Sequence, residues 1–424
     1  MNAGLLIIIL LLGLALLGFP IYIALGIGAL AALNLADLPL IVLPQRMFAG
    51  MNGSALLAIP FFILAGNIMS RSITGKLIDI CNAIIGHIKG SLSLVTILAS
   101  ALFGAISGSG VATASAIGGI TIPAMKREGY PAPFAVGVAS ISSILGPIIP
   151  PSIVLIVYAS ITNVSVAELF LGSVLPGIIL AVALIAYGLY YGHKHNLPAH
   201  EKPNLRKIGS SVRKGIWALL MPIIILGGIY SGAFSPTEAG VVSCVYGLIV
   251  GLFLYKELDY KKILPMFKSK VNFLGGMMFC FAPAGALGAV FAYLGYTTVI
   301  KNFFLNISSN PYIIVLLIYA FLFVAGMFVQ TAPIIVIISP LLLPVAEAVG
   351  IDPVHFGIII TLALAVAFVT PPVAYNLFVG ASMSGMSIDK ISKAAIPFIV
   401  GLVLAEIIVG FVPQISMLPV NLFG

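Results

Sequence analysis

The amino-acid sequence predicts an all-α polytopic membrane protein. Of its 424 residues, 61% are hydrophobic and only 8% are charged, and the mean hydropathy is +1.21. A chain this apolar has helices that face lipid as well as one another. Uncharged segments rich in Gly, Ser and Pro interrupt the hydrophobic stretches, and such segments break helices. No polar stretch is long enough for a soluble domain, so residues 1–424 are expected to form a single membrane domain.

The charged residues indicate an orientation in the membrane. The net charge of +8 comes from short basic loops, which is typical of the positive-inside rule and does not indicate binding to nucleic acid. The loops 192–214 and 256–270 are therefore expected on the cytoplasmic side, and the turn 235–239 on the outside. Arg46 and Lys301 do not follow the rule. The three cysteines are far apart in sequence and predict neither a disulfide framework nor a metal site.

The first half of the chain combines spans, one amphipathic stretch and two interruptions. Residues 4–18 are similar to a signal peptide, but the apolar sequence continues to about residue 33 without a basic segment before it, which favours a retained span. Proline removes amide donors, so the run from Gly146 to Pro151 should break its helix. The expected elements are spans over 4–33 and 50–70, an interfacial amphipathic helix over 74–90, a hairpin over 91–125, a broken span over 132–160 and a span over 168–191.

The second half is expected to contain a similar set of elements. It has a second hairpin candidate with Gly326-Met327-Phe328-Val329-Gln330-Thr331 at its tip, and a second broken span interrupted at Thr370-Pro371-Pro372. The expected elements are spans over 216–233, 238–254 and 271–293, an interfacial stretch over 296–310, the hairpin over 312–345, the broken span over 354–380 and a last span over 395–417.

The first hairpin is the segment around which the chain is organised. Ser107-Gly108-Ser109-Gly110 is polar but uncharged and has apolar residues on both sides. Non-helical backbone at membrane depth has to be buried in protein or line a wet cavity, and this favours a re-entrant hairpin with an unwound tip. Such a tip offers hydroxyls, carbonyls from one half-helix and amides from the other. A small-residue face for helix packing is the alternative interpretation.

The two halves repeat at a shift of about 221 residues. The shift superposes Pro123 on Pro344 and Pro176 on Pro397, and about six prolines match where chance gives roughly one. Repeat one covers about residues 1–200 and repeat two about 238–424, and each has an even number of crossings. The unmatched connecting span 216–233 therefore inverts the second copy, which predicts inverted structural repeats with two re-entrant hairpins and two broken helices.

Two oxygen-rich clusters follow from this plan. Both hairpin tips should meet near the membrane midplane beside the broken spans, where hydroxyl and carbonyl oxygens can surround a hard cation, and Na⁺ is the natural candidate. Helices kinked only for packing are the alternative. The first cluster is Ser107, Ser109, Gly146, Ile149 and Pro151, and the mirror cluster is Gly326, Met327, Gln330, Ala367, Thr370 and Pro372.

Other polar residues are weaker candidates. Ser109, Thr113, Gln330 and Asn376 can contact a substrate, as can Ser115, although such groups more often form hydrogen bonds between helices. Glu406 lies within the last span, where it is expected to pair at a subunit interface, to line water or, less favourably, to reach the membrane surface. Glu238 is expected to cap a helix, and His355 to be structural. No nucleophile cluster, phosphate loop or organic-cofactor motif stands out, so the sequence does not indicate an enzyme.

Four motifs resemble those of one transporter family. They are Gly-Ser-Gly-Val-Ala-Thr-Ala-Ser-Ala-Ile-Gly from Gly108, Gly-Pro-Ile-Ile-Pro-Pro-Ser from Gly146, Pro-Thr-Glu-Ala-Gly from Pro236 and Gly-Ile-Asp-Pro-Val-His-Phe-Gly from Gly350. With them the chain resembles, over nearly its whole length, the large membrane subunit of tripartite ATP-independent periplasmic (TRAP) transporters.

The resemblance implies a function that composition and spacing do not show. It implies a sodium-driven importer of organic acids such as C4-dicarboxylates or sialic acid, located in the bacterial inner membrane. It implies a small membrane subunit and a periplasmic substrate-binding protein as partners, and an elevator mechanism in which hairpins and broken helices move against a scaffold. The family's sodium positions correspond to the first cluster and, less closely, to the second.

The sequence departs from the family pattern in its second half. Gln330 stands where Asp is expected, Ala363 where Asn is expected, and Ala367 and Ala374 where glycines are expected. These differences affect the second ion site and the substrate class. A stand-alone sodium:carboxylate symporter, which needs no binding protein, and a non-transporting membrane scaffold, which shows no ion-dependent uptake, are the alternatives.

Overall fold

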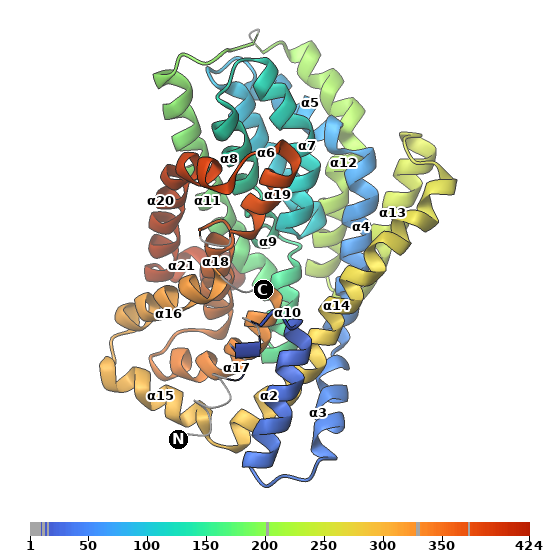
Figure 1. The fold of residues 1–424 in the computed structure, drawn as a ribbon. Helices are drawn as coiled ribbons and strands as arrows, with labels where there is room; N and C mark the ends of the chain where they lie inside the picture. The colour runs from blue at the N-terminus through green and yellow to red at the C-terminus, as the bar shows by residue number, and fades with distance from the viewer. Residues whose placement is uncertain (1–9, 11–12, 15–16, 201–202, 328–330, 372–373) are drawn as a thin grey trace.

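The computed structural model describes residues 10, 13–14, 17–200, 203–327, 331–371 and 374–424. Within these residues the chain is helical, with turns and loops but no β-strand (Figure 1). Eight of the described helices are long and apolar enough to cross a membrane. This agrees with the prediction of an all-α polytopic membrane protein.

The first half contains helices on both sides of the predicted hairpin tip. The tip lies between α6 and α7, and the first broken span becomes the three short helices α8, α9 and α10. The elements are α2 (Ile21–Leu35), α3 (Val42–Met51), η1 (Ser54–Leu57), α4 (Ala58–Ser72), α5 (Thr74–Ile85), α6 (Ser91–Ser107), α7 (Gly110–Arg127), α8 (Ala132–Ser142), α9 (Leu145–Ile148), α10 (Ile153–Thr162) and α11 (Val166–Lys194).

The second half repeats this order of elements after α12, α13 and α14. A short helix, a helical hairpin, an interrupted span and a long helix follow one another again as α15, α16–α17, α18–α19 and α20. The elements are α12 (Leu205–Tyr230), α13 (Pro236–Ile249), the π-helical turn η2 (Val250–Leu254), α14 (Tyr260–Tyr293), α15 (Tyr296–Ile307), α16 (Pro311–Gly326), α17 (Thr331–Ala348), α18 (Pro353–Ala367), α19 (Tyr375–Ser384), α20 (Ile388–Phe411) and α21 (Gln414–Phe423).

Local sequence explains several helix boundaries. The Ser235 hydroxyl accepts a hydrogen bond from the Glu238 amide at 3.3 Å, and the Glu238 carboxylate accepts one from the Ser235 amide at 2.7 Å. This capping box starts α13 and confirms the capping role expected of Glu238. The last span was predicted wrongly, because α20 ends at Phe411 and α21 follows. Pro413 lacks an amide proton and disfavours a helical conformation in the residue before it.

The segment 256–270 was expected to be a loop, but most of it is helical. Instead of a connection, most of it forms the beginning of α14, which runs for 34 residues from Tyr260 to Tyr293. Lysine, leucine and methionine favour helix, so the lysine-rich end extends the span in continuous helical form. In Figure 1 this helix crosses the molecule diagonally, packed against α2, α3 and α4.

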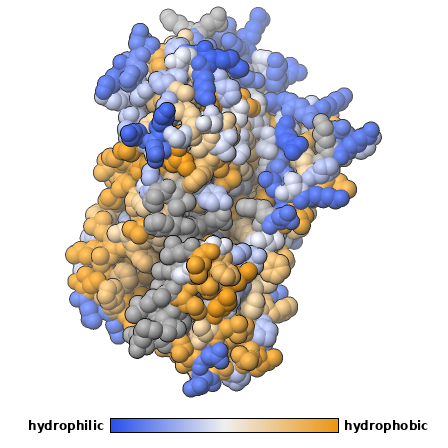
Figure 2. All heavy atoms as spheres, viewed as in Figure 1, coloured by the Kyte–Doolittle hydropathy of each residue, from blue (hydrophilic) through white to orange (hydrophobic). Residues whose placement is uncertain are grey.

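The central packing layer surrounds the first hairpin. Helices α6, α8, α11, α18 and α20 pack against one another. Their large side chains are almost fully buried, among them Phe103, Phe134, Phe170, Phe356 and Phe398. Figure 2 shows hydrophobic residues over the middle of the visible face and hydrophilic residues gathered mainly at one end. This distribution fits helices that bury one face in protein and expose the other to lipid.

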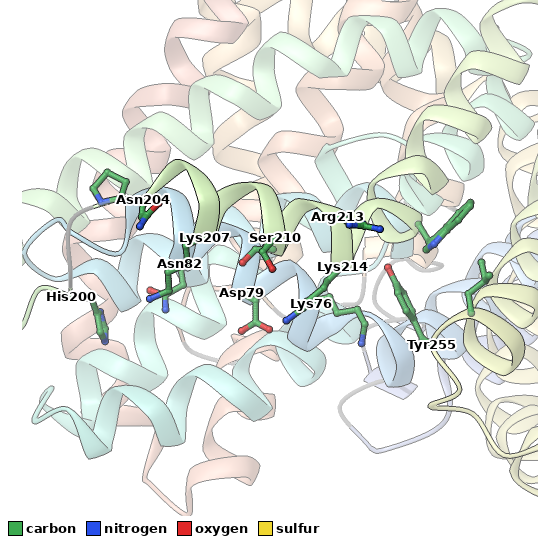
Figure 3. A pocket seen from close by; sticks show the side chains of 15 residues that line it. Lys76, Asp79, Asn82, His200, Asn204, Lys207, Ser210, Arg213, Lys214 and Tyr255 are labelled. Atoms are coloured by element: carbon green, nitrogen blue, oxygen red, sulfur yellow. The ribbon is translucent and has the colours of Figure 1, made fainter.

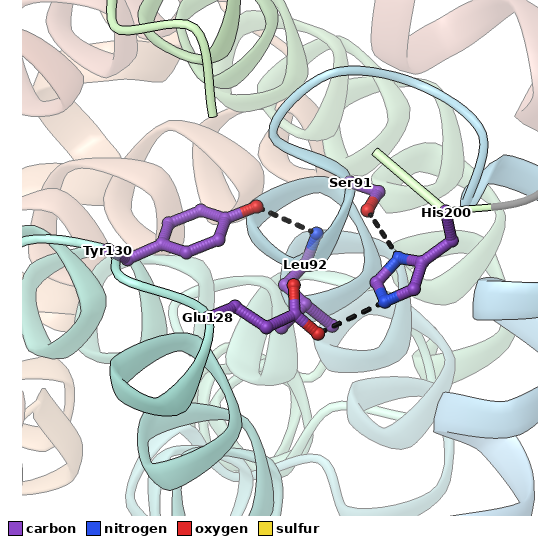
Figure 4. A network of polar contacts seen from close by, with 5 residues as sticks. All are labelled: Ser91, Leu92, Glu128, Tyr130 and His200. Atoms are coloured by element: carbon purple, nitrogen blue, oxygen red, sulfur yellow. Dashed lines mark hydrogen bonds and ion pairs between the residues drawn. The ribbon is translucent and has the colours of Figure 1, made fainter. Parts of the chain in front are cut away.

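Five residues hold the open end of the first hairpin together (Figure 4). The His200 ring lies between Ser91 at the start of α6 and Glu128 at the end of α7, with Nδ1 3.1 Å from the Ser91 hydroxyl and Nε2 3.0 Å from the Glu128 carboxylate. The Leu92 amide donates to the Tyr130 hydroxyl at 3.3 Å. Burial raises the pKa of Tyr130 to about 12, so this hydroxyl stays protonated at neutral pH. The network connects both ends of the hairpin to the segment before α12.

The orientation of the chain is open to a direct test. Leu205 is the first residue of α12 and Ala233 lies in the turn after this helix; both are exposed, whereas the three native cysteines are buried. In Leu205→Cys and Ala233→Cys variants, a membrane-impermeant thiol reagent added outside is expected to label position 233 and not position 205, because the basic loop stays inside. Labelling of position 205 from outside would contradict the orientation and the inverted-repeat plan.

Candidate functional site

The tip of the first hairpin is an abrupt interruption between two helices. Helix α6 ends at Ser107, and Gly108 has a positive φ of +60°, which glycine adopts without steric cost. Ser109 is extended and caps α7, because its hydroxyl accepts a hydrogen bond from the Ala112 amide. Gly66 of α4 allows close packing here, since a Cβ on it would lie 3.0 Å from Ser107. The tip is therefore built into the protein interior.

Three oxygen atoms of the tip lie close together. The Thr113 hydroxyl donates to the Ser109 carbonyl oxygen at 2.8 Å and lies 3.2 Å from the Ser107 hydroxyl. The Ser107 hydroxyl is 3.5 Å from the same carbonyl. The side chains of Ser107 and Thr113 are buried. A group of neutral oxygens at this spacing is a chemically suitable environment for a hard cation.

The first broken span packs directly onto this tip. A Cβ on Gly146 of α9 would lie 2.8 Å from the Ser109 carbonyl oxygen and 2.9 Å from the Thr113 hydroxyl. A Cβ on Gly108 would lie 2.7 Å from the Pro151 carbonyl oxygen. The structure thus brings Ser107, Ser109, Gly146 and Pro151 into one place, together with Thr113, which was expected to contact substrate.

The side chain of Ile149, unlike its main chain, does not point to the first cluster. Its side chain packs against α11, where a Cβ on Gly177 would lie 2.8 Å from Ile149 Cγ1. Its backbone is extended at the end of α9, with ψ of 126°. Only the main chain of Ile149 is therefore suited to provide an oxygen ligand.

The second cluster is only partly described. A Cβ on Gly326 at the end of α16 would lie 2.7 Å from the Ala367 Cβ, so these two positions are in contact. Thr370 lies just after α18, and its hydroxyl donates to the Val366 carbonyl in the last turn of that helix at 2.8 Å. Met327 lies beside Gly326 at the cavity described below. Gln330 and Pro372 lie outside the described residues.

The gap between α18 and α19 is bridged by hydrogen bonding and ring stacking. The main-chain amide of Asn376 donates to the main-chain carbonyl of Phe368 at 3.2 Å, and the rings of Phe368 and Tyr375 stack with centroids 5.1 Å apart. Ala374 caps α19 with φ of +47°, in the left-handed region that favours glycine. The alanine found here in place of the family's expected glycine is therefore in a strained conformation.

Asn376 connects the second broken span to the first hairpin. The side chain is fully buried, and its Nδ2 donates to the Ser143 hydroxyl at 2.7 Å. A Cβ on Gly110, the first residue of α7, would lie 2.9 Å from the same nitrogen. Among the described residues Asn376 Oδ1 has no hydrogen-bond partner. A buried acceptor without a partner is costly and is suited to a ligand that donates to it or coordinates it.

A cavity of about 1000 Å³ opens beside these groups. Residues 109–112, the N-cap and first turn of α7, line it together with Asn376 and Thr331, and Phe368 and Tyr375 contribute aromatic faces. The N-terminus of a helix presents free amides and a partial positive charge, which favour an anion. The basic side chains of Arg71 on α4 and Lys270 on α14 also line the cavity. The cavity combines positive potential with apolar walls.

Several of these residues were not found by sequence reasoning. Ser143 and Phe368 lie in the predicted broken spans but outside their Pro-containing interruptions, Arg71 lies near the end of α4, and Lys270 lies in the segment predicted as a basic loop. No motif marked any of the four as a cavity residue. Of the weaker candidates, Ser115 lines the cavity and donates to the Val111 carbonyl at 2.9 Å.

Glu406 and His355 lie within the protein and away from the cavity lining. Glu406 is 2% exposed, and its main-chain carbonyl accepts a hydrogen bond from the Tyr319 hydroxyl at 2.8 Å. The expectations of a subunit contact or a side chain reaching the membrane surface were therefore wrong, because α16 packs over this face of α20. His355 Nδ1 lies 2.6 Å from the Ser416 hydroxyl and joins α18 to α21, as expected of a structural residue.

The chain matches one family model over residues 8–415, described as the DctM component of the tripartite ATP-independent periplasmic transporter. It is 37% identical over 398 residues to the C4-dicarboxylate TRAP transporter large permease protein DctM of Pseudomonas aeruginosa, covering 94% of this chain and 93% of that protein.

Two further relatives are named for other anions. The chain is 34% identical to the sialic acid TRAP transporter large permease protein SiaM of Vibrio cholerae, covering 97% of each protein. It is 36% identical to the isethionate TRAP transporter permease protein DctMQ of Oleidesulfovibrio alaskensis, covering 94% of this chain and 64% of that longer protein. The three relatives are therefore named for three different substrates.

Proposed function

The chain belongs to the DctM family of tripartite ATP-independent periplasmic transporters, and on this premise we propose that it is the large permease of a sodium-driven importer of an organic acid. The relatives are transporter permease components and not enzymes. The observation that carries the proposal is the cavity of about 1000 Å³ between the first hairpin, α4, α14 and α19.

The substrate is an organic anion with a carboxylate or a related acidic group. Its acidic end binds the first turn of α7, where free amides and the helix dipole stabilise negative charge. Arg71 and Lys270 add positive potential along the cavity wall. The aromatic faces of Phe368 and Tyr375 contact the apolar part of the substrate. C4-dicarboxylates and sialic acid are the first compounds to test.

Sodium ions provide the driving force. The first ion binds among the oxygens of Ser107, Ser109 and Thr113 and the main chain of Gly146, Ile149 and Pro151. Neutral oxygen ligands suit a hard monovalent cation, and the buried position limits competition from water. A second ion binds near Gly326 and Thr370, in the cluster that the inverted repeat relates to the first ion site. Binding ion and anion on one hairpin couples their movements.

The permease works with two partners in the bacterial inner membrane. A periplasmic binding protein delivers the substrate and a small membrane subunit completes the permease. Two observations support these partners: the family is described as a tripartite transporter, and the relative named DctMQ is longer than this chain. The lipid bilayer surrounds the exposed apolar helix faces.

Transport proceeds by an elevator movement. The two hairpins and the two broken spans, arranged as inverted repeats, move as one body against α4, α12, α13 and α14. The supporting observation is packing: α4 lies against α13 and α14, and the hairpins pack on the broken spans through α7 with α8 and α19 and through α16 and α17 with α18 and α10. Substrate and ions cross with the moving body.

Asn376→Asp is expected to weaken substrate binding. The new carboxylate can still accept a hydrogen bond from the Ser143 hydroxyl, so the local fold is retained. A negative charge several ångströms from an acidic substrate costs roughly 2–3 kcal/mol at an effective dielectric of about 20, which corresponds to at least a tenfold rise in KM for uptake.

The matched control is Asn306→Asp, an exposed residue on α15 outside the cavity lining. Uptake by this control should keep the wild-type KM. An unchanged KM in Asn376→Asp, with both proteins reconstituted to equal amounts, would show that the anion does not bind at this end of α7.

A further inference from the structure

A second cavity, of about 920 Å³, lies away from the proposed transport site, between α5, α12 and the end of η2 (Figure 3). In Figure 3 the side chains of α5 and α12 face each other across it. Helices α5 and α12 touch where Gly215 lacks a side chain, since a Cβ there would lie 2.5 Å from Ile80 Cδ1. The pocket forms beside this close contact between the two helices.

The lining of this pocket is strongly cationic. Lys76, Lys207, Arg213 and Lys214 line it, and among the described residues Asp79 is the one carboxylate in the lining. Lys76 pairs with Glu257, and its Nζ lies 4.3 Å from the centre of the Tyr255 ring.

Positive charge remains available in the pocket despite these contacts. In the described part of the chain, neither Arg213 nor Lys214 forms an ion pair, and both are exposed to solvent. Two unpaired cations beside each other in a concave site favour a ligand with a phosphate group.

Neutral polar groups complete a lining suited to phosphate. Ser210 and Ser211 of α12 supply hydroxyl donors, and the amides of Asn82 and Asn204 lie on opposite sides. A phosphate diester has one negative charge shared by two oxygens, and both oxygens accept such hydrogen bonds in addition to the charge attraction.

The pocket also has an apolar, membrane-facing side. Trp217 and Leu254 line it and are 40% and 45% exposed. Tryptophan is enriched at the membrane–water interface, and α12, which carries Trp217, is long and apolar enough to cross a membrane. A soluble phosphate would use the cations but not this apolar side, whereas a phospholipid would use both.

We propose that this pocket binds the phosphate headgroup of an anionic phospholipid from the leaflet on the side of the basic loops, which is the cytoplasmic leaflet by the positive-inside rule. The acyl chains extend past Trp217 and Leu254 along α12. The bound lipid joins α5, which packs on the first hairpin, to α12 of the surrounding helices.

The test is native mass spectrometry of the purified full chain titrated with phosphatidylglycerol or phosphatidylcholine. The double variant Arg213→Gln, Lys214→Gln is expected to bind phosphatidylglycerol roughly 30-fold more weakly, because two cationic contacts are lost. The matched control, Lys390→Gln with Lys393→Gln, removes two exposed lysines outside the pocket and should bind as the wild type does.

A second variant changes binding in the opposite direction. Asp79→Asn removes a carboxylate from the lining and is expected to strengthen phosphatidylglycerol binding about fivefold. Equal binding by wild type and both pocket variants would overturn the site. Displacement of the lipid by inorganic phosphate at equal concentration would overturn the lipid assignment and identify a soluble phosphate ligand. The measurement needs no transport activity, so it is independent of the proposed function.

Discussion

Replacing Gly146 with alanine is expected to reduce sodium-dependent uptake by about 5- to 100-fold. Gly146 lies in the short helix α9, so alanine suits its backbone and the effect comes from the added methyl group. That methyl would lie 2.8 Å from the Ser109 carbonyl and 2.9 Å from the Thr113 hydroxyl. Overpacking of this kind typically costs about 1–3 kcal/mol, and here it separates the oxygens that we assign to the first sodium ion.

The control for this variant is Gly209→Ala on α12. A Cβ at Gly209 meets no atom within 4 Å, so the same chemical change fits in open space. It should leave uptake unchanged and stabilise the helix slightly. The Gly146→Ala protein should need more sodium for half-maximal uptake, and Ser107→Ala, which removes one of the oxygens without adding volume, should do the same. An unaltered sodium response in both variants would exclude the first hairpin tip as the ion site.

Removing the sodium gradient or the binding protein is expected to abolish concentrative uptake. In the proposed function the sodium gradient supplies the free energy of uptake and the binding protein delivers the substrate. A membrane potential supplies about 2.3 kcal/mol per unit charge per 100 mV, which is roughly a fiftyfold gradient. If two cations move with a monoanion, one net charge enters, and a negative interior should accelerate uptake.

The experiment reconstitutes the chain with its small membrane partner in liposomes. Labelled C4-dicarboxylates and sialic acid are supplied outside, with and without the binding protein. The control replaces the inward sodium gradient by an equal potassium gradient at the same membrane potential. Equal uptake with potassium would contradict sodium coupling, and equal uptake without binding protein would favour the stand-alone symporter. If no ion-dependent uptake occurred under any condition, the chain would be a scaffold.

Sequence patterns predicted the positions of the helix breaks well because their causes are local. Gly108 needs a positive φ, Ser109 caps the helix that follows, and the prolines near residue 150 remove backbone donors. Boundaries set by less specific signals were less accurate. The segment 256–270 became mostly helix, and the last span ended before Pro413.

The cavity lining depended on contacts that no local pattern encodes. Asn376 is adjacent to Gly110 and Ser143 only because α19 packs on α7 and α8. Arg71 resembles any basic residue at a helix end until α4 is placed beside the hairpin tip. The pocket between α5 and α12 likewise depends on tertiary packing, because Gly215 lets the two helices approach each other.

The sequence alone determined the class and the helix breaks of this protein, because hydropathy, proline and glycine act over a few neighbouring residues, and its four motifs indicated the family by resemblance. Only the tertiary structure decided which of the polar residues share a site. Ser107, Thr113 and Ser109 are close in sequence, but their approach to Gly146 and the position of Asn376 depend on how separate helices pack. That packing arises from side-chain volumes summed over the whole core, and no short stretch of sequence contains this information.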